Sequence, residues 1–94
     1  MYSRKVTVLN KTGLHARPAS VFVGTASKFK ADVTVNRLDE NGEVVNSCPA
    51  KSIVFLLTMA ISQGTVIELT ADGEDGQAAV DALVNLVESG FGER

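Results

Sequence analysis

The chain has a single histidine, His15, inside the run GLHARPA at residues 13–19. Pro18 is tolerated in the first turn of a helix, because the N–H that it lacks has no helical partner there. A helix is therefore predicted to begin at about His15 or Ala16. Backbone N–H groups at a helix start bind anions, and the positive end of the helix disfavours a protonated ring. We expect His15 to be a neutral nucleophile beside an anion site.

Arg17 stands two residues after His15. Its guanidinium stays charged and offers a planar set of donors to phosphate. A neutral imidazole, oriented amides and a guanidinium are the groups that a transient phosphohistidine needs. The spacing alone also fits a plainer alternative, an exposed N-cap histidine with a solvated arginine nearby, since polar residues are common at helix starts.

A second candidate region begins at Ser52, which can cap a short helix from Ile53 to about Ala60. Apolar side chains occupy residues 53–57 and Met59 of this helix. Only one stripe of a helix that lies on a sheet can be buried, so some of these side chains should face solvent or a partner. The alternative is a helix that is buried almost all round.

Period-two alternation of apolar and polar residues predicts four strands, around residues 5–8, 32–36, 43–46 and 67–71. Asn41-Gly42 is a strong hairpin signal between the second and third strands. Residues 47–50 are predicted to be a connector. The sheet should be antiparallel, with one solvated face.

Apolar residues at helical spacing predict the faces of two longer helices. In the first helix they are Ala19, Phe22, Val23 and Ala26, and in the last they are Ala79, Ala82, Leu83, Leu86 and Val87, with Gly90 as the C′ residue. The predicted order is βαββαβα. The fold class is α+β, a two-layer open-faced sandwich in which three helices cover one face of a four-stranded antiparallel sheet.

Length and composition indicate one globular domain, residues 1–94. The lone Cys48 cannot form an internal disulfide, no signal peptide is evident, and the longest apolar run, 53–57, is too short to span a membrane. We therefore expect a cytoplasmic protein. Residues 1–47 carry seven Lys/Arg against four Asp/Glu (+3), and residues 48–94 carry two against seven (−5). This balance argues against a general nucleic-acid binder.

The GLHARPA run closely resembles the active-site signature of HPr, the family of histidine-containing phosphocarriers of the bacterial sugar phosphotransferase system. The resemblance extends to ADVTV at 31–35, KSI at 51–53, SQGT at 62–65 and ADGED at 71–75. It implies the HPr-like form of the predicted fold. It also implies a stoichiometric carrier, not an enzyme, that uses no cofactor and no metal.

The resemblance further implies that enzyme I, charged from phosphoenolpyruvate, phosphorylates the pros nitrogen of His15, and that Arg17 assists. The group then passes to enzyme II A components of sugar permeases. Residues that match Ile53, Val54 and Leu57 help these partners to dock in the family. A monomer is expected, with no membrane insertion and no direct contact with nucleic acid.

Ser52 matches the serine that an HPr kinase/phosphorylase modifies in many Gram-positive members, which makes the carrier a partner of a catabolite-control transcription factor. A phosphate at a helix N-cap would meet free amides, but Ser52 also fits the role of a simple cap. A purely regulatory HPr-like protein that acts through phospho-Ser52 is thus an alternative, although His15 is present. A small-ligand regulatory domain of similar build would have no special need for His15.

Three features depart from the family pattern. The segment between Val35 and Ser52 looks longer than in familiar members. Lysines that are frequent in the family are replaced by Gly24, Ser27 and Phe55, which weakens the basic rim around the partner surface. Cys48 has no family role, and we interpret it as a small apolar residue.

Overall fold

The computed structural model describes residues 1–92. Its elements follow one another along the chain with these bounds: β1 (Tyr2–Thr7), α1 (Ala16–Ala26), β2 (Val33–Leu38), β3 (Val44–Pro49), α2 (Ile53–Thr58), β4 (Val66–Ala71), α3 (Gly76–Glu88) and the 3₁₀ turn η1 (Gly90–Gly92). The predicted order βαββαβα is confirmed. None of the helices in residues 1–92 is long and apolar enough to cross a membrane.

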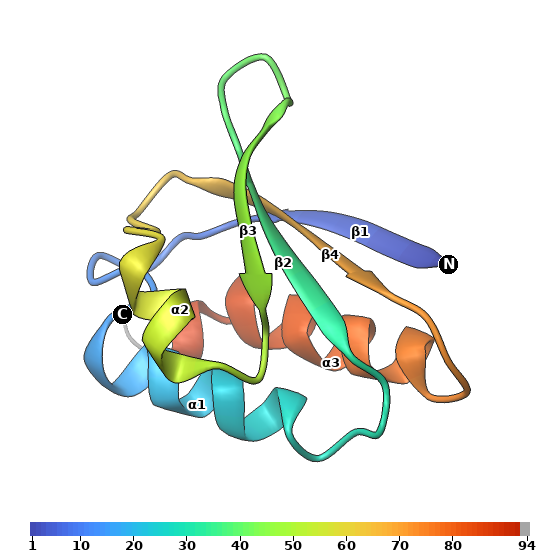
Figure 1. The fold of residues 1–94 in the computed structure, drawn as a ribbon. Coiled ribbons are helices and arrows are strands. Elements are labelled where there is room, and N and C mark those ends of the chain that lie inside the picture. Colours follow the sequence, from blue (N-terminus) through green and yellow to red (C-terminus); the bar gives the residue numbers. More distant parts are fainter. Residues whose placement is uncertain (93–94) are drawn as a thin grey trace.

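The strands form one antiparallel sheet in the order β1-β4-β2-β3. Figure 1 shows α1 and α3 against one face of this sheet, with α2 beside α1. The register brings Val35 of β2 opposite Cys48 on one side and opposite Leu69 of β4 on the other. All three side chains are buried, so this row of the sheet faces the helices. The predicted four-stranded antiparallel sheet with three helices is confirmed.

The core lies between the sheet and the two long helices. On α1, Ala19, Phe22 and Ala26 are fully buried as predicted, whereas Val23 is only half-buried. On α3, the predicted face is partly wrong, because Val80 and Val84 are fully buried while Ala82 and Leu86 are half-buried. Apolar residues occupy more than one stripe of this helix, so spacing alone could not place the centre of the buried face.

The prediction that residues 47–50 form a connector is wrong for Ser47, Cys48 and Pro49, which belong to β3. They pair with Asn36, Val35 and Thr34 of β2. A proline argues against a central strand, but β3 is at the edge of the sheet, where a missing N–H does not interrupt a ladder. The β2–β3 hairpin extends well beyond the rest of the molecule (Figure 1).

Candidate functional site

The loop from β1 to α1 ends at His15, which is the N-cap residue of α1. The helix begins at Ala16, within the predicted range. His15, Ala16 and Arg17 are all exposed. His15 has an extended backbone (φ −128°, ψ 160°), and its side chain makes no capping hydrogen bond. The backbone around His15 therefore places its Cα–Cβ bond without help from a side-chain cap.

That backbone turns sharply on both sides of His15. Ala16 has a φ of +52°, a left-handed conformation that costs an L-residue roughly 1–2 kcal/mol. Gly13 has a φ of +65°, and a Cβ there would lie 2.4 Å from the carbonyl oxygen of Ile61. The next residue, Leu14, is fully buried and donates its N–H to the same oxygen at 3.0 Å. The loop is thus pressed onto the Ile61 backbone just before it presents His15 to solvent.

Two kinds of donor lie close to His15 in the chain. The backbone N–H groups of Ala16 and Arg17 open the helix and have no partner within it. The Arg17 guanidinium is exposed and donates one N–H to the carbonyl oxygen of Phe91 at 3.2 Å. This contact connects the start of α1 to the turn after α3. A guanidinium has five N–H groups, so most of its donors remain for an anion.

Helix α2 begins with Ser52 at its N-cap, and the Ser52 hydroxyl accepts a hydrogen bond from the N–H of Phe55 at 3.4 Å. The predicted cap is confirmed, and the helix ends two residues earlier than predicted. The exposed fractions of Val54, Phe55 and Leu57 are 66%, 58% and 42%. Ile53, in contrast, is half-buried and packs against the core.

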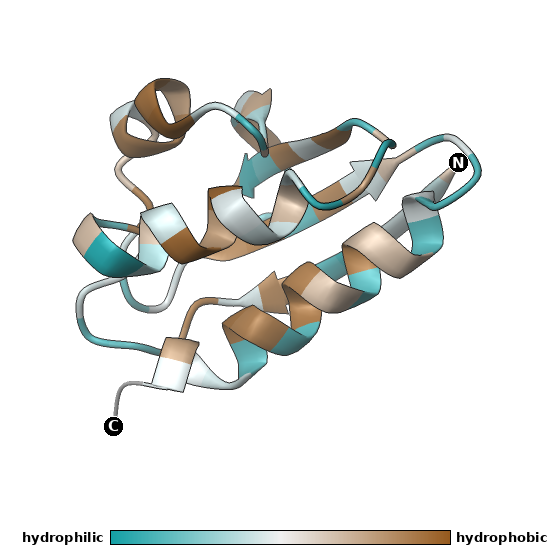
Figure 2. Ribbon diagram, turned by 90° about the horizontal axis from the view of Figure 1, so that it is seen from below, coloured by the Kyte–Doolittle hydropathy of each residue, from teal (hydrophilic) through white to brown (hydrophobic). Residues whose placement is uncertain are grey.

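Helix α2 contacts α1. Figure 2 shows that its ribbon is hydrophobic over most of its length. The prediction that the apolar side chains of α2 are not all buried is therefore confirmed, and the alternative of a helix buried all round is excluded.

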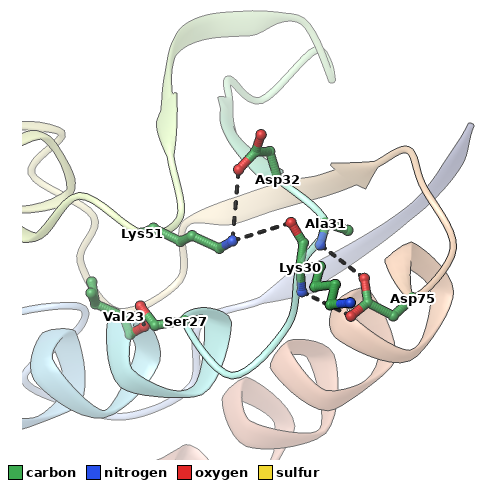
Figure 3. A network of polar contacts seen from close by, with 7 residues as sticks. All are labelled: Val23, Ser27, Lys30, Ala31, Asp32, Lys51 and Asp75. Atoms are coloured by element: carbon green, nitrogen blue, oxygen red, sulfur yellow. Dashed lines mark hydrogen bonds and ion pairs between the residues drawn. The ribbon is translucent and has the colours of Figure 1, made fainter.

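A polar network holds the loop between α1 and β2 (Figure 3). The Asp75 carboxylate, at the start of α3, accepts the backbone N–H groups of Lys30 and Ala31 at 2.8 Å each. These hydrogen bonds, that of Lys30 first, hold the pKa of Asp75 below its usual value. On the other side, the Lys51 ammonium lies 3.7 Å from the carboxylate of Asp32 and 3.5 Å from the carbonyl oxygen of Lys30. Lys51, the residue before Ser52, thereby connects the start of α2 to this loop.

A cleft of about 480 Å³ is lined by Leu9, Lys11, Gln63 and Glu88 among others, and its lining includes neither His15 nor Arg17. Within residues 1–92, no group of three or more His, Cys, Asp or Glu side chains is arranged to hold a metal ion. His15 and Arg17 are exposed at the surface, outside this cleft.

Sequence reasoning missed two residues at this site. The sequence gives Asn10 no candidate role, yet this polar residue is only 5% exposed. Phe91 provides the carbonyl oxygen that accepts from Arg17. Neither residue has a signal in its type or spacing, because each acts through a neighbour that is brought close only by folding.

Comparisons with known proteins all indicate the same family. The family model described as "PTS HPr component phosphorylation site" matches residues 2–89. The phosphocarrier protein HPr of Haemophilus influenzae is 44% identical over 87 residues, which cover 93% of this chain and 95% of that protein. The HPr-like protein Crh of Bacillus subtilis is 46% identical over 88 residues, which cover 94% and 96%. A crystal structure of HPr from Thermoanaerobacter tengcongensis superposes with a TM-score of 0.89 at 45% identity and covers 100% of this chain and 99% of that one.

Proposed function

The chain belongs to the HPr family of phosphocarrier proteins, and on that basis we propose that it takes a phosphoryl group from enzyme I onto His15 and donates it to enzyme II A components of sugar permeases. The observation that carries this proposal is the exposed His15 at the start of α1, beside the amides of Ala16 and Arg17. Residues 1–94 would act as one cytoplasmic domain and as a monomer.

The proposed reaction moves one phosphoryl group from phosphorylated enzyme I to the imidazole ring of His15. The lone pair on Nδ1 of His15 attacks phosphorus, and a new P–N bond forms while the bond between phosphorus and the donor group of enzyme I breaks. The electron pair of the broken bond returns to that donor group. Charge on the three transferring oxygens would be met by the Ala16 and Arg17 amides, which are oriented before the reaction begins.

Arg17 would add a charged donor on the same side. Its guanidinium is exposed and uses one N–H for the Phe91 carbonyl oxygen. The remaining donors can reach phosphoryl oxygens after a small movement of the long side chain. Hydrogen bonds between a guanidinium and phosphate are about twice as strong as neutral ones, so Arg17 should lower the barrier to transfer without taking part in bond making.

Helix α2 would supply the docking surface for the partners. Val54 and Leu57 are exposed, and Ile53 is half-buried at the edge of the core, so Val54 and Leu57 are the stronger candidates for direct contact. Because α2 packs beside α1, a protein seated on these side chains would also cover His15 and exclude water during transfer.

A regulatory role through Ser52 is the second candidate function. Ser52 is at the start of α2, and its hydroxyl is only weakly engaged by Phe55 N–H at 3.4 Å. A phosphate there would add about two negative charges beside the α2 surface, near Lys51. The relationship to the HPr-like protein Crh favours keeping this role, either alongside phosphoryl transfer or in place of it. An HPr kinase/phosphorylase and a catabolite-control transcription factor would then be partners.

Onward transfer is the experiment that tests the proposed carrier. The chain is incubated with phosphoenolpyruvate and a catalytic amount of enzyme I, separated from both, and then mixed with an enzyme II A domain. We expect the phosphoryl group to leave the chain and appear on the II A domain, and His15→Ala to carry none. A group that forms on the wild-type chain but is never passed on would contradict the role as a carrier.

A further inference from the structure

Asn10 is the one buried polar side chain in residues 1–92, at 5% exposure. It lies in the loop between β1 and His15. Its side-chain Nδ2 donates to the carbonyl oxygen of Gly13 at 2.9 Å and to the hydroxyl of Thr12 at 3.0 Å. Its backbone carbonyl oxygen accepts the N–H of Gly13 at 3.2 Å. One residue therefore holds both the N–H and the C=O of Gly13.

This double hold matters because of where Gly13 lies. Gly13 approaches the Ile61–Ser62 backbone so closely that a Cβ would come within 2.4 Å and 2.7 Å of two of its atoms. Leu14 follows and is fixed on the Ile61 carbonyl oxygen at 3.0 Å. Two sets of contacts thus fix the segment that leads to His15, namely the hydrogen bonds between Asn10 and Gly13 inside the loop and the contacts with the Ile61 backbone outside it. Together they form the clamp on Gly13.

The His15 side chain makes no capping hydrogen bond, so the clamped backbone, which places its Cα–Cβ bond, sets where the ring can lie. The strained φ of +52° at Ala16, next along the chain, shows that the turn from loop to helix is sharp. If the clamp on Gly13 loosens, this turn can relax, and the ring moves relative to the Ala16 and Arg17 amides. A misplacement of about 1 Å can slow a reaction by up to a hundredfold.

We infer that Asn10 is a positioning residue for phosphoryl transfer, acting on His15 through Gly13 without touching the phosphoryl group. This inference rests on the proposed function of His15 as acceptor. The amide is the required group, because the site needs a donor toward Gly13 C=O. An aspartate carboxylate has the same shape but can only accept, and it would place a charge against a carbonyl oxygen in a buried position.

Steady-state transfer from enzyme I, measured over a range of carrier concentrations, separates positioning from docking. For Asn10→Ala we expect kcat to fall about tenfold, with KM for the carrier within about twofold of wild type, because α2 is untouched. Asn10→Asp should show the same split. The single histidine allows a second readout, since the ring ¹⁵N signals of His15 should shift or broaden in both variants.

Val80→Ala is the matched control for lost stability. Val80 is fully buried on α3, away from the loop, so the variant should melt lower but keep its kcat and its His15 signals. The inference is overturned if a folded Asn10 variant keeps the wild-type kcat, or if Val80→Ala loses as much kcat for the same fall in melting temperature. If the wild-type chain accepts no phosphoryl group, the proposed function fails first and the inference falls with it. Normal transfer by wild type and by both Asn10 variants would overturn the inference alone.

Discussion

Replacing Gly13 by alanine tests how tightly the loop before His15 is packed. The new Cβ would meet the Ile61 carbonyl oxygen at 2.4 Å and Ser62 Cα at 2.7 Å, both of them backbone atoms. Ordinary contact distances would require the loop and the 61–62 backbone to separate by roughly 1 Å, and overpacking of this kind typically costs about 1–3 kcal/mol. The positive φ of +65° adds roughly 1–2 kcal/mol.

Gly42→Ala is the matched control. Gly42 also has a positive φ, +81°, but a Cβ there would meet nothing within 4 Å. The conformational cost and the change in unfolded-chain entropy are similar at the two positions, so they largely cancel in the comparison. The difference that remains, about 1–3 kcal/mol, is the clash with the Ile61–Ser62 backbone.

Thermal melts of the three proteins measure this difference. In a domain of this size, about 1 kcal/mol corresponds to roughly 4–8 °C, so Gly13→Ala should melt about 5–20 °C below Gly42→Ala. The transfer rate should fall as well for Gly13→Ala, because the displaced loop carries His15, and should be unchanged for Gly42→Ala. If the two variants melt at the same temperature, the close approach of this loop to Ile61 is wrong, and so is the clamp derived from it.

Three further predictions concern the surface of the protein. Arg17→Ala should reduce the transfer rate about a hundredfold and lower the melting temperature little, because its side chain is exposed; a large loss of stability at an unchanged rate would reverse this assignment. The hydrogen bonds from Lys30 and Ala31 lower the pKa of Asp75 from 3.8, so its carboxylate stabilises the fold at neutral pH and this contribution is lost as the pH falls below about 4. Asp75→Asn should therefore melt lower at pH 7 and lose less between pH 5 and pH 3 than wild type, and parallel melting curves would contradict this. Val54→Glu should raise KM for the carrier in the enzyme I reaction by about tenfold with normal circular dichroism, since a charge would be buried at the contact; wild-type kinetics would show that α2 is not the docking surface.

The sequence was sufficient for most of the fold, because alternation and helical spacing report which side chains are buried. It failed where position in the sheet decides. A proline such as Pro49 usually indicates the end of a strand, and only the place of β3 at the edge of the sheet makes it compatible with one. The buried face of α3 was partly misplaced for a similar reason, since Val80 and Leu86 are equally apolar and only packing tells them apart.

The candidate site, like the fold, could be predicted from the sequence only in part. The place of His15 and Arg17 at the start of a helix followed from Pro18 and the apolar spacing, and the structure agrees with it. Their roles stay predictions. The contact of Arg17 with Phe91 joins residues 74 positions apart. Asn10 lies beside Gly90, where an added Cβ would be 4.0 Å from the Asn10 Cβ, so neither feature could be inferred from local pattern.

The mass of the intact chain after incubation with enzyme I and phosphoenolpyruvate, read before and after brief acid treatment, tests the central claim most directly. We expect one phosphoryl group per chain that is lost in acid, because protonation makes the imidazole a good leaving group, and that is absent from His15→Ala. A phosphoryl group that survives acid, or an acid-labile group that still forms on His15→Ala, would contradict the assignment of His15 as the acceptor.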